Sequence, residues 1–343
     1  MEEKIISKEE LPELLANITR RYQVFAPVNK GDSFAFEEIN PEDKISFTCA
    51  NTKKSVKELF FPQRERLFAF NLHKKDESKV SALSDRKRVI IGVRPCDAKG
   101  ISIFDDVFNG KDFQDPYYLQ KREDTVVIAI GCNAPERTCF CTSTGGSPFS
   151  TNGSDVLLVD LGDSFLAQPV TEKGEAFLEQ ESVTRKADQS QIQLKEKVIE
   201  KALSSVKSQI KPEKIKEKLD KNFDDPLWTK VHEKCLGCGV CTFFCPTCHC
   251  FDIFDETGGQ TGERIRIWDS CMFPLFTLHA SGVNPRPTGK ERLRQRVMHK
   301  FKYFVDNNGK VACSGCGRCI KYCPVNLDIR EVLEQIQDQP LER

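Results

Sequence analysis

The chain has 343 residues, of which 39% are hydrophobic, so it is long enough to bury a core and to form about two domains. Its 51 Lys and Arg balance 51 Asp and Glu, which removes the overall electrostatic argument for a nucleic-acid or membrane-surface partner. The first residues lack the apolar stretch of a secretory signal, and no run of about 18 apolar residues occurs to span a bilayer. We therefore expect a cytoplasmic protein without membrane insertion.

The N-terminal part alternates helical and strand-like segments. Leucines and isoleucines at helical spacing predict a helix within 7–22, and residues 98–108 form a second helical pattern. The runs at 88–93 and 125–130 are continuously apolar and rich in β-branched residues, as in strands buried on both faces. This alternation predicts an α/β domain over residues 1–170. The segments predicted as strands are 23–28, 88–93, 125–130 and 155–161.

Residues 171–225 differ in composition, because Lys, Glu and Gln dominate there. Apolar residues recur at helical spacing between Ile192 and Ile210, with charged residues on the outer faces. Pro212 suits the first turn of a further helix, and Asp224-Asp225-Pro226 ends the segment. We therefore predict a charged helical connector over 171–225.

Cysteine is the compositional outlier, with 16 residues, eleven of them after residue 230. A reducing compartment offers little use for disulfides, so metal binding or thiol chemistry is the usual reason for so many. The pattern C-x2-C-x2-C-x3-C-P occurs twice, beginning at Cys235 and at Cys313, and both copies match the ligand pattern of bacterial ferredoxins. The glycines that allow the backbone to approach a cluster closely are Gly237, Gly239, Gly315 and Gly317.

Two 4Fe–4S clusters are the prediction from this repeated motif. In two-cluster ferredoxins the fourth cysteine of each motif binds the other cluster, because it lies on the helix that leaves the loop. We therefore expect a mostly α-helical, ferredoxin-like dicluster domain over 226–343, after the α/β domain and the helical connector. The predicted ligands are Cys235, Cys238, Cys241 and Cys323 for cluster 1, and Cys245, Cys313, Cys316 and Cys319 for cluster 2.

Two neighbouring clusters pass one electron at a time, so the repeated motif predicts electron transfer. We expect no catalytic residue in this domain. Zinc also binds four thiolates, although its sites normally use paired C-x2-C knuckles. A zinc-binding structural or adaptor protein is therefore the alternative. Metal and acid-labile sulfide analysis separates the two interpretations.

The segment 247–312 separates the two motifs and has features of its own. Thr288 and Glu291 form a capping box that opens a helix with apolar residues on one face. The other face is basic. We interpret it as charge compensation for the clusters, as an ordinary solvated face, or as a docking surface for an acidic partner; the sequence gives little support for nucleic-acid binding. The basic residues are Arg286, Lys290, Arg292, Arg294, Arg296, Lys300 and Lys302.

Four cysteines of the α/β domain follow the ends of its predicted strands, where sheets of this class place ligands. Cys96 lies beside Arg94 at the start of a predicted helix, which favours its thiolate. Four thiolates from neighbouring loops form the candidate site of a third 4Fe–4S cluster; the alternative is four buried thiols without a ligand. The four cysteines are Cys96, Cys132, Cys139 and Cys141.

The remaining cysteines have weaker patterns. Cys248, Cys250 and Cys271 lie near the first motif in sequence, and we interpret them mainly as structural, although they are also candidate ligands of an additional cluster. Cys49 has no partner pattern and is interpreted as a core residue. A stand-alone reductase with its site near Cys96 is a further alternative, but the sequence contains no dinucleotide fingerprint and no recognisable pair of base and nucleophile.

Several segments together resemble the 4Fe–4S dicluster subunits typified by the sulfhydrogenase beta subunit and the corresponding subunit of anaerobic sulfite reductase. The resemblance covers most of the chain, and it is the segments flanking the ferredoxin motifs that make it specific. They are Leu59-Phe60-Phe61-Pro62-Gln63, Gly92-Val93-Arg94-Pro95-Cys96-Asp97, Thr138-Cys139-Phe140-Cys141, Cys245-Pro246-Thr247-Cys248, Trp268-Asp269-Ser270-Cys271 and His299-Lys300-Phe301-Lys302-Tyr303.

This resemblance implies an electron-transfer subunit that works within a complex of anaerobic metabolism. A flavoprotein subunit linked to NAD(P)H is implied on one side. On the other side it implies a catalytic redox subunit of the hydrogenase, sulfite reductase or heterodisulfide reductase type. These partners are expectations from the family.

Overall fold

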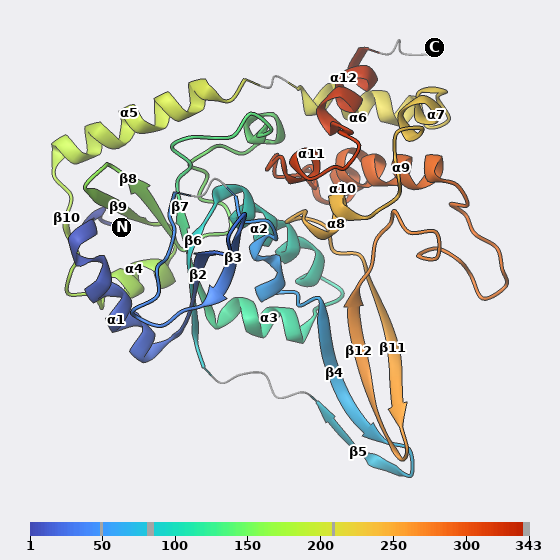
Figure 1. The fold of residues 1–343 in the computed structure, drawn as a ribbon, viewed down its shortest axis with the longest axis horizontal. Coiled ribbons are helices and arrows are strands. Elements are labelled where there is room, and N and C mark those ends of the chain that lie inside the picture. The colour runs from blue at the N-terminus through green and yellow to red at the C-terminus, as the bar shows by residue number, and fades with distance from the viewer. Residues whose placement is uncertain (49–50, 81–85, 208–209, 339–343) are drawn as a thin grey trace. The chain divides into compact units, whose positions relative to one another are not determined.

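The computed structural model describes residues 1–48, 51–80, 86–207 and 210–338 (Figure 1). The chain divides into two compact units. Unit 1 comprises Met1–Phe60, Ser84–Gln209 and Ser314–Cys316. Unit 2 comprises Phe61–Leu83, Ile210–Cys313 and Gly317–Arg343. The triplet 314–316 thus belongs to unit 1, although it lies within the second cysteine motif.

Within the described residues, the centre of unit 1 is an eight-stranded mixed sheet with the order β10-β1-β9-β8-β7-β6-β2-β3. The run β2, β6, β7 and β8 is parallel, with Val89 opposite Val126 and Ile128 opposite Val156, whereas the other pairs are antiparallel. Each parallel strand in the sheet centre was predicted from its apolar run. The strands are β1 (Lys4–Ser7), β2 (Gln23–Asn29), β3 (Phe34–Glu38), β6 (Arg88–Val93), β7 (Thr125–Ile130), β8 (Val156–Asp160), β9 (Ser164–Pro169) and β10 (Arg185–Lys186).

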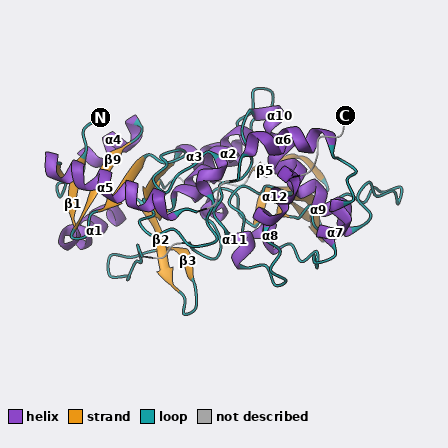
Figure 2. Cartoon of the chain, turned by 90° about the horizontal axis from the view of Figure 1, so that it is seen from above, coloured by secondary structure: helices purple, strands orange, loops and turns teal. Residues whose placement is uncertain are grey.

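Helices lie beside this sheet, as Figure 2 shows from above. One apolar cluster joins Ile128 of the sheet to residues of α1 and α4, and a second joins the neighbouring Ala129 to Ala202 of α5. Because adjacent strand residues point to opposite faces, the two clusters cover the two faces of the sheet. The helices of unit 1 are α1 (Leu11–Arg21), α2 (Pro95–Phe108), α3 (Pro116–Glu123), α4 (Glu172–Glu179) and α5 (Gln189–Ser205), with the 3-10 turns η1 (Lys8–Glu10), η2 (Val56–Leu59) and η3 (Cys141–Thr144).

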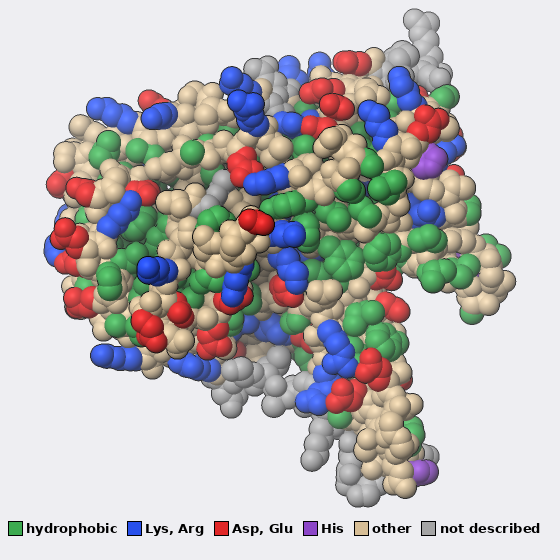
Figure 3. Space-filling view, in the orientation of Figure 1, with side chains coloured by type: hydrophobic (Ala, Val, Ile, Leu, Met, Phe, Trp, Pro, Cys, Tyr) green, Lys and Arg blue, Asp and Glu red, His purple; other side chains and the backbone are tan. Residues whose placement is uncertain are grey.

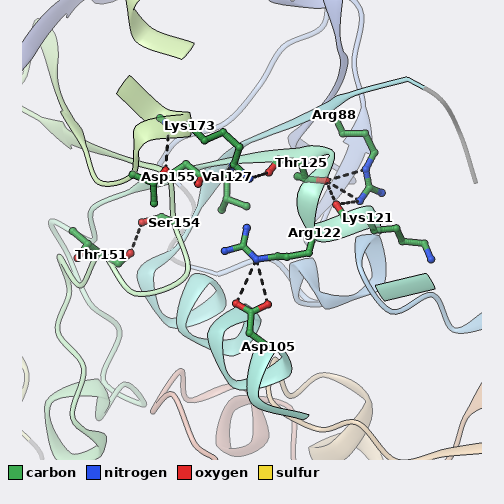
Figure 4. A network of polar contacts seen from close by, with 12 residues as sticks. Arg88, Asp105, Lys121, Arg122, Thr125, Val127, Thr151, Ser154, Asp155 and Lys173 are labelled. Atoms are coloured by element: carbon green, nitrogen blue, oxygen red, sulfur yellow. Dashed lines mark hydrogen bonds and ion pairs between the residues drawn. The ribbon is translucent and has the colours of Figure 1, made fainter. Parts of the chain in front are cut away.

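A polar network holds the central strand β7 at its amino end (Figure 4). The buried carboxylate of Asp155 accepts a hydrogen bond from the Val127 amide at 2.8 Å and forms an ion pair with Lys173 at 3.4 Å. Arg88 donates to Thr125 Oγ1 at 2.8 Å and to the carbonyl of Lys121 at 3.0 Å. These bonds fix one end of the parallel strands, so the opposite, carboxyl end is held in a defined position.

Unit 2 contains, in its described part, a four-stranded antiparallel sheet of order β11-β12-β4-β5. The strands β11 and β12 form a hairpin, and β12 pairs with β4, which is distant in sequence. A buried ion pair between Arg266 of β12 and Glu65 of β4 links these two strands. The strands are β4 (Arg64–Asn71), β5 (Lys74–Val80), β11 (Phe251–Gly258) and β12 (Thr261–Trp268).

The helices of unit 2 are short, and those of the cysteine motifs begin directly after their loops. Thr288 and Glu291 form the predicted capping box, in which the Thr288 amide donates to Glu291 Oε2 at 3.0 Å. The helical elements are α6 (Pro212–Lys221), α7 (Leu227–His232), α8 (Val240–Phe243), α9 (Gly289–Met298), the π-helical turn η4 (His299–Tyr303), α10 (Phe304–Asn308), α11 (Arg318–Lys321) and α12 (Ile329–Asp338).

The prediction of a mostly α-helical dicluster domain is wrong, because the C-terminal region contains the β11–β12 hairpin between the two motifs. The segment Thr261–Trp268 alternates polar and apolar residues, with Ile265 and Trp268 buried, which is the period of a strand. The hairpin joins the sheet only through β4, whose residues are some 200 positions away. Sequence spacing alone does not reveal such a pairing.

No helix in the described ranges is long and apolar enough to cross a membrane. Cys49, predicted as a core residue, lies outside the described residues.

Candidate iron–sulfur sites

The loops of the two cysteine motifs repeat the same backbone conformation. Gly237 and Gly315 have φ values of 68° and 65°, and Gly239 and Gly317 both have a φ of 76°. These left-handed values favour glycine, because a side chain there meets the following carbonyl. Gly239 and Gly317 then cap α8 and α11, which contact each other. The sequence repeat is therefore also a structural repeat.

Unit 2 contains a cavity that is partly open to solvent, which we call the motif cavity. All four cysteines predicted for cluster 1 line it, and Cys319 lines it as well. Cys323 is held by the Leu327 amide, which donates to its Sγ at 3.2 Å, and the Gly237 amide donates to Cys235 Sγ at 3.4 Å. Backbone amides directed at sulfur stabilise thiolates. The chemistry and arrangement of these donors fit a 4Fe–4S cluster with the predicted ligands.

The cysteines predicted for cluster 2 are divided between the two units. Cys245, Cys313 and Cys319 belong to unit 2, and Cys319 lies within electrostatic range of the other two. Burial raises the pKa of Cys319 to about 12, so its thiol ionises when a metal replaces the proton. Cys316 belongs to unit 1. The assignment of these four residues to one cluster stays a prediction.

A second cavity, also partly open to solvent, lies within unit 1 at the carboxyl ends of β6 and β7, and we call it the sheet-edge cavity. The four cysteines predicted for a third cluster all line it, and so does Cys316. Cys96 is in the first turn of α2, directly after β6, and Cys132 follows β7. Because β6 and β7 are parallel, their carboxyl ends meet at one edge of the sheet.

The walls of the sheet-edge cavity are fixed by backbone contacts. Asn51 donates to the carbonyl of Cys316 at 3.0 Å, and the Phe140 amide donates to the carbonyl of Gly315 at 2.8 Å. Arg94, predicted to favour a thiolate at Cys96, lines the cavity, and its guanidinium donates to the carbonyls of Gly131 and Phe47, at 2.6 Å each. Five thiols therefore surround a space with a buried cation in its wall.

Burial decides the protonation of the thiols in this cavity. It raises the pKa of Cys139 to about 12 and that of Cys141 to about 11, and the neighbouring Cys132 adds to both shifts. Thiols with such pKa values are protonated at neutral pH, and a bound metal would displace the protons. The donor set is suited to a group that binds as a thiolate complex.

The predicted basic stripe separates into surface and buried cations. Arg294 pairs with Asp224 at 2.7 Å, and Lys302 pairs with Asp220 at 3.0 Å. Arg296 and Lys300, by contrast, are each only 4% exposed. On the face shown in Figure 3, positive and negative side chains are interspersed and form no large patch of one sign. The stripe thus supplies two buried charges in addition to ordinary surface pairs.

Cysteines are the anionic partners of both buried cations. Burial acts to lower the pKa of Arg296, but Cys241, Cys319 and Cys248 outweigh it and raise the pKa well above the usual value. The pKa of Lys300 is raised in the same way. Burial alone would lower it, but the nearby Cys245 and Cys248 have the larger, opposite effect. A buried cation requires an anionic partner. Thiolates bound to clusters would provide that charge.

Cys248, Cys250 and Cys271, interpreted from the sequence mainly as structural, also line one cavity. Arg296, His299 and Lys300 also line this cavity of unit 2, which we call the hairpin cavity. Burial lowers the pKa of His299 to about 4, so its imidazole is neutral. In the sequence, the close spacing of Cys248 and Cys250 was the feature that indicated a shared site.

In the described part of the chain, no three His, Cys, Asp or Glu side chains are gathered closely enough to hold a single metal ion. Thiolates at a zinc ion all converge on one atom, at about 2.3 Å. In a cubane cluster each cysteine binds its own iron, so the ligands surround a larger space. Cysteine-lined cavities are the arrangement that a cluster requires.

These motifs and cavities define the chain as an iron–sulfur protein of the dicluster class, and a family model for a 4Fe-4S dicluster domain matches residues 234–327. The chain is 32% identical over 335 residues to sulfhydrogenase 2 subunit beta of Pyrococcus furiosus, covering 97% of this chain and 98% of that protein. It therefore belongs to the family of sulfhydrogenase beta subunits and is an iron–sulfur electron-transfer protein. No solved structure matches the chain.

Proposed function

We propose that this chain is the cytoplasmic electron-relay subunit of a multi-subunit oxidoreductase. It takes single electrons from a flavoprotein subunit linked to NAD(P)H and passes them to a catalytic redox subunit, or carries them in reverse. The name of the Pyrococcus relative, a sulfhydrogenase subunit, supports a partner of the hydrogenase type. Sulfite reductase and heterodisulfide reductase types are the other partners that the family resemblance implies.

The observation that carries this proposal is the motif cavity, which gathers the four cysteines predicted for cluster 1. The ferredoxin spacing then assigns Cys245, Cys313, Cys316 and Cys319 to cluster 2. The sheet-edge cavity, which Cys96, Cys132, Cys139 and Cys141 line, supports a third cluster in addition to these two. None of these residues is given a bond-making role, because the clusters themselves carry the electrons.

The position of Cys238 in this chain supports exchange of electrons with another protein. Cys238 is exposed, and the neighbouring Leu236 is 69% exposed in the same loop. Arg296 and Leu293 close the inner side of the motif cavity, both being buried. One edge of cluster 1 therefore faces the surface of this chain, where a partner subunit can bring its own cofactor close.

The test begins with the full chain purified without oxygen. We expect a brown protein whose absorption near 400 nm bleaches on reduction, with at least about eight irons and equal acid-labile sulfide per chain. Reduced flavoprotein from the same complex should reduce it, and the variant Cys238→Ser should lose cluster 1 and slow this reaction. Stoichiometric zinc without acid-labile sulfide would contradict the proposal.

Partner identity needs a separate experiment. The tagged chain is purified from its own cells without oxygen, and the accompanying subunits are identified by mass spectrometry. We expect a flavoprotein and a catalytic redox subunit in fixed ratio to the chain. Recovery of the iron-loaded chain alone, without either subunit, would contradict the relay between partners while leaving the cluster assignment intact.

A further inference from the structure

We propose that Cys248, Cys250 and Cys271 bind an additional iron–sulfur centre in the hairpin cavity, separate from the three clusters proposed above. All three cysteines line this cavity, which lies within unit 2.

The chain positions these thiols from two elements. Cys248 and Cys250 precede β11, and Cys271 follows β12, so the hairpin brings its two ends together. Pairing of Phe251 with Trp268 fixes the register at this end of the hairpin, and the Asp269 amide donates to the carbonyl of Cys250 at 2.9 Å. Consequently the side chains of Cys250 and Cys271 lie close together in one cavity. About twenty residues separate Cys250 from Cys271 in the sequence, so the sequence alone does not show that they lie close together.

The second observation is that two buried cations line the hairpin cavity. Arg296 and Lys300 line the cavity, and both residues are only 4% exposed. Lys300 Nζ donates to Thr247 Oγ1 at 2.8 Å, to the carbonyl of Ala312 at 2.9 Å and to Cys245 Sγ at 3.4 Å. Arg296 Nε, by contrast, is buried without a hydrogen-bond partner. An anionic group in the cavity would satisfy this unpaired donor and offset both charges.

The donors favour a cluster over a single ion. Three cysteines and one histidine would also complete the ligand set of a structural zinc ion, but in the described part of the chain no three such side chains are gathered closely enough for one ion. A cubane takes three thiolates on three of its irons and needs one further ligand. His299 and His249 line the same cavity, and their imidazoles are the ligands available to the fourth iron. His299 lies in η4, a π-helical turn of the kind often found at functional sites.

The location gives this centre a place in the relay. Arg296 lines both the motif cavity and the hairpin cavity, so one guanidinium lies between cluster 1 and the additional centre. A change of charge at either centre would then be felt at the other, because both act on the same buried cation.

The first experiment compares the full chain with the double variant Cys250→Ser/Cys271→Ser after anaerobic reconstitution. The variant should lose about four irons and about four sulfides relative to the unaltered chain, with the spectra of the other clusters preserved. Arg294→Met, on the same helix α9 but outside the lining of the hairpin cavity, is the matched control and should retain the full metal content. A double variant that is folded and keeps all its iron and sulfide would overturn the inference.

A second measurement uses the unaltered protein, since serine variants can fail to fold. The iron-loaded chain is alkylated under native anaerobic conditions, a parallel sample is alkylated in denaturant after the iron has been chelated, and mass spectrometry assigns the labels. Cys248 and Cys250 are partly exposed, so as thiols they would react with the reagent. We expect both to be protected in the iron-loaded chain and labelled in the stripped one. Labelling of either in the iron-loaded chain, with Cys235 and Cys323 protected, would overturn this inference alone; a chain that binds no iron at all would instead contradict the proposed function.

Discussion

The motif cavity of unit 2 and the sheet-edge cavity of unit 1 reach similar donor sets by different routes. In the motif cavity, Cys235, Cys238 and Cys241 come from one short loop whose glycines adopt left-handed conformations. In the sheet-edge cavity, Cys96 follows β6, whereas Cys132, Cys139 and Cys141 lie in the connection between β7 and β8, and the parallel pairing of β6 with β7 brings these two segments together.

The difference shows what holds each set of thiols in place. Local backbone conformation organises the motif cavity, so it depends on loop residues near the cysteines. Sheet topology organises the sheet-edge cavity, so it depends on strand register and on contacts such as that between Phe140 and Gly315. Changes that act on one cavity should therefore spare the other, and the following predictions test this independence.

Removal of one cysteine from each cavity should have the largest effect. Cys241→Ser should remove cluster 1, and Cys139→Ser should remove the third cluster, so that each variant loses about four irons while the other cavity keeps its own. Iron and sulfide analysis with electron paramagnetic resonance of the reduced chain measures this. Independence would be disproved if either single variant emptied both cavities in a chain that remained folded.

A matched pair of glycines should give the next largest effect. Gly237 and Gly315 have nearly equal φ values, but a Cβ on Gly237 would lie 3.7 Å from its nearest neighbour, whereas one on Gly315 would lie 2.5 Å from the Cys141 amide nitrogen. Gly237→Ala should cost about 1 kcal/mol of stability, and Gly315→Ala at least about twice as much. Thermal unfolding of the iron-loaded variants measures both. Equal shifts of Tm would show that the Gly315 loop does not depend on its contact with Cys141.

Loss of the buried charge at Arg296 should change redox behaviour more than metal content. Arg296→Met removes a cation from the wall of the motif cavity, so the reduced, more negative cluster loses stabilisation. The midpoint potential of cluster 1 should become more negative, by about 60 mV for a tenfold change in the reduction equilibrium. A redox titration followed by electron paramagnetic resonance measures the shift, with the sheet-edge cluster as internal reference. An unchanged potential would show that the clusters do not feel this charge.

The smallest effect is expected at Arg294, two residues earlier on α9. Its partner Asp224 is largely exposed, so this ion pair contributes about 0–1 kcal/mol, although the Arg294 side chain is itself 12% exposed and stacks on the Phe223 ring at 3.7 Å. Arg294→Met should therefore leave the cluster potentials unchanged and lower Tm modestly. A potential shift as large as that of Arg296→Met would mean that the basic stripe acts as a whole and not through its buried members.

Local signals in the sequence accounted for much of the fold and of the motif cavity. The apolar runs at 88–93 and 125–130 predicted central strands because burial on both faces demands such composition. The spacing of Cys235, Cys238 and Cys241 predicted a shared cavity because one loop carries all three.

Features that depend on pairing between distant segments were missed. The β11–β12 hairpin was overlooked because its alternation lies in a segment dominated by cysteine and charge signals, and its partner β4 is far away in sequence. Cys248, Cys250 and Cys271 were grouped from the sequence as candidate ligands of an additional cluster, but the hairpin that brings them to one cavity was not predicted. The burial of Arg296 and Lys300 is likewise not distinguishable in a stripe that also holds surface cations.

The central claim is that the cysteine-lined cavities of this chain hold iron–sulfur clusters that carry electrons. The most direct measurement is the iron and acid-labile sulfide content of the full chain purified without oxygen, combined with electron paramagnetic resonance after reduction. The account predicts at least about eight irons with equal sulfide, and signals of interacting reduced 4Fe–4S clusters. A chain that holds zinc, or no metal, and yields no acid-labile sulfide would contradict it.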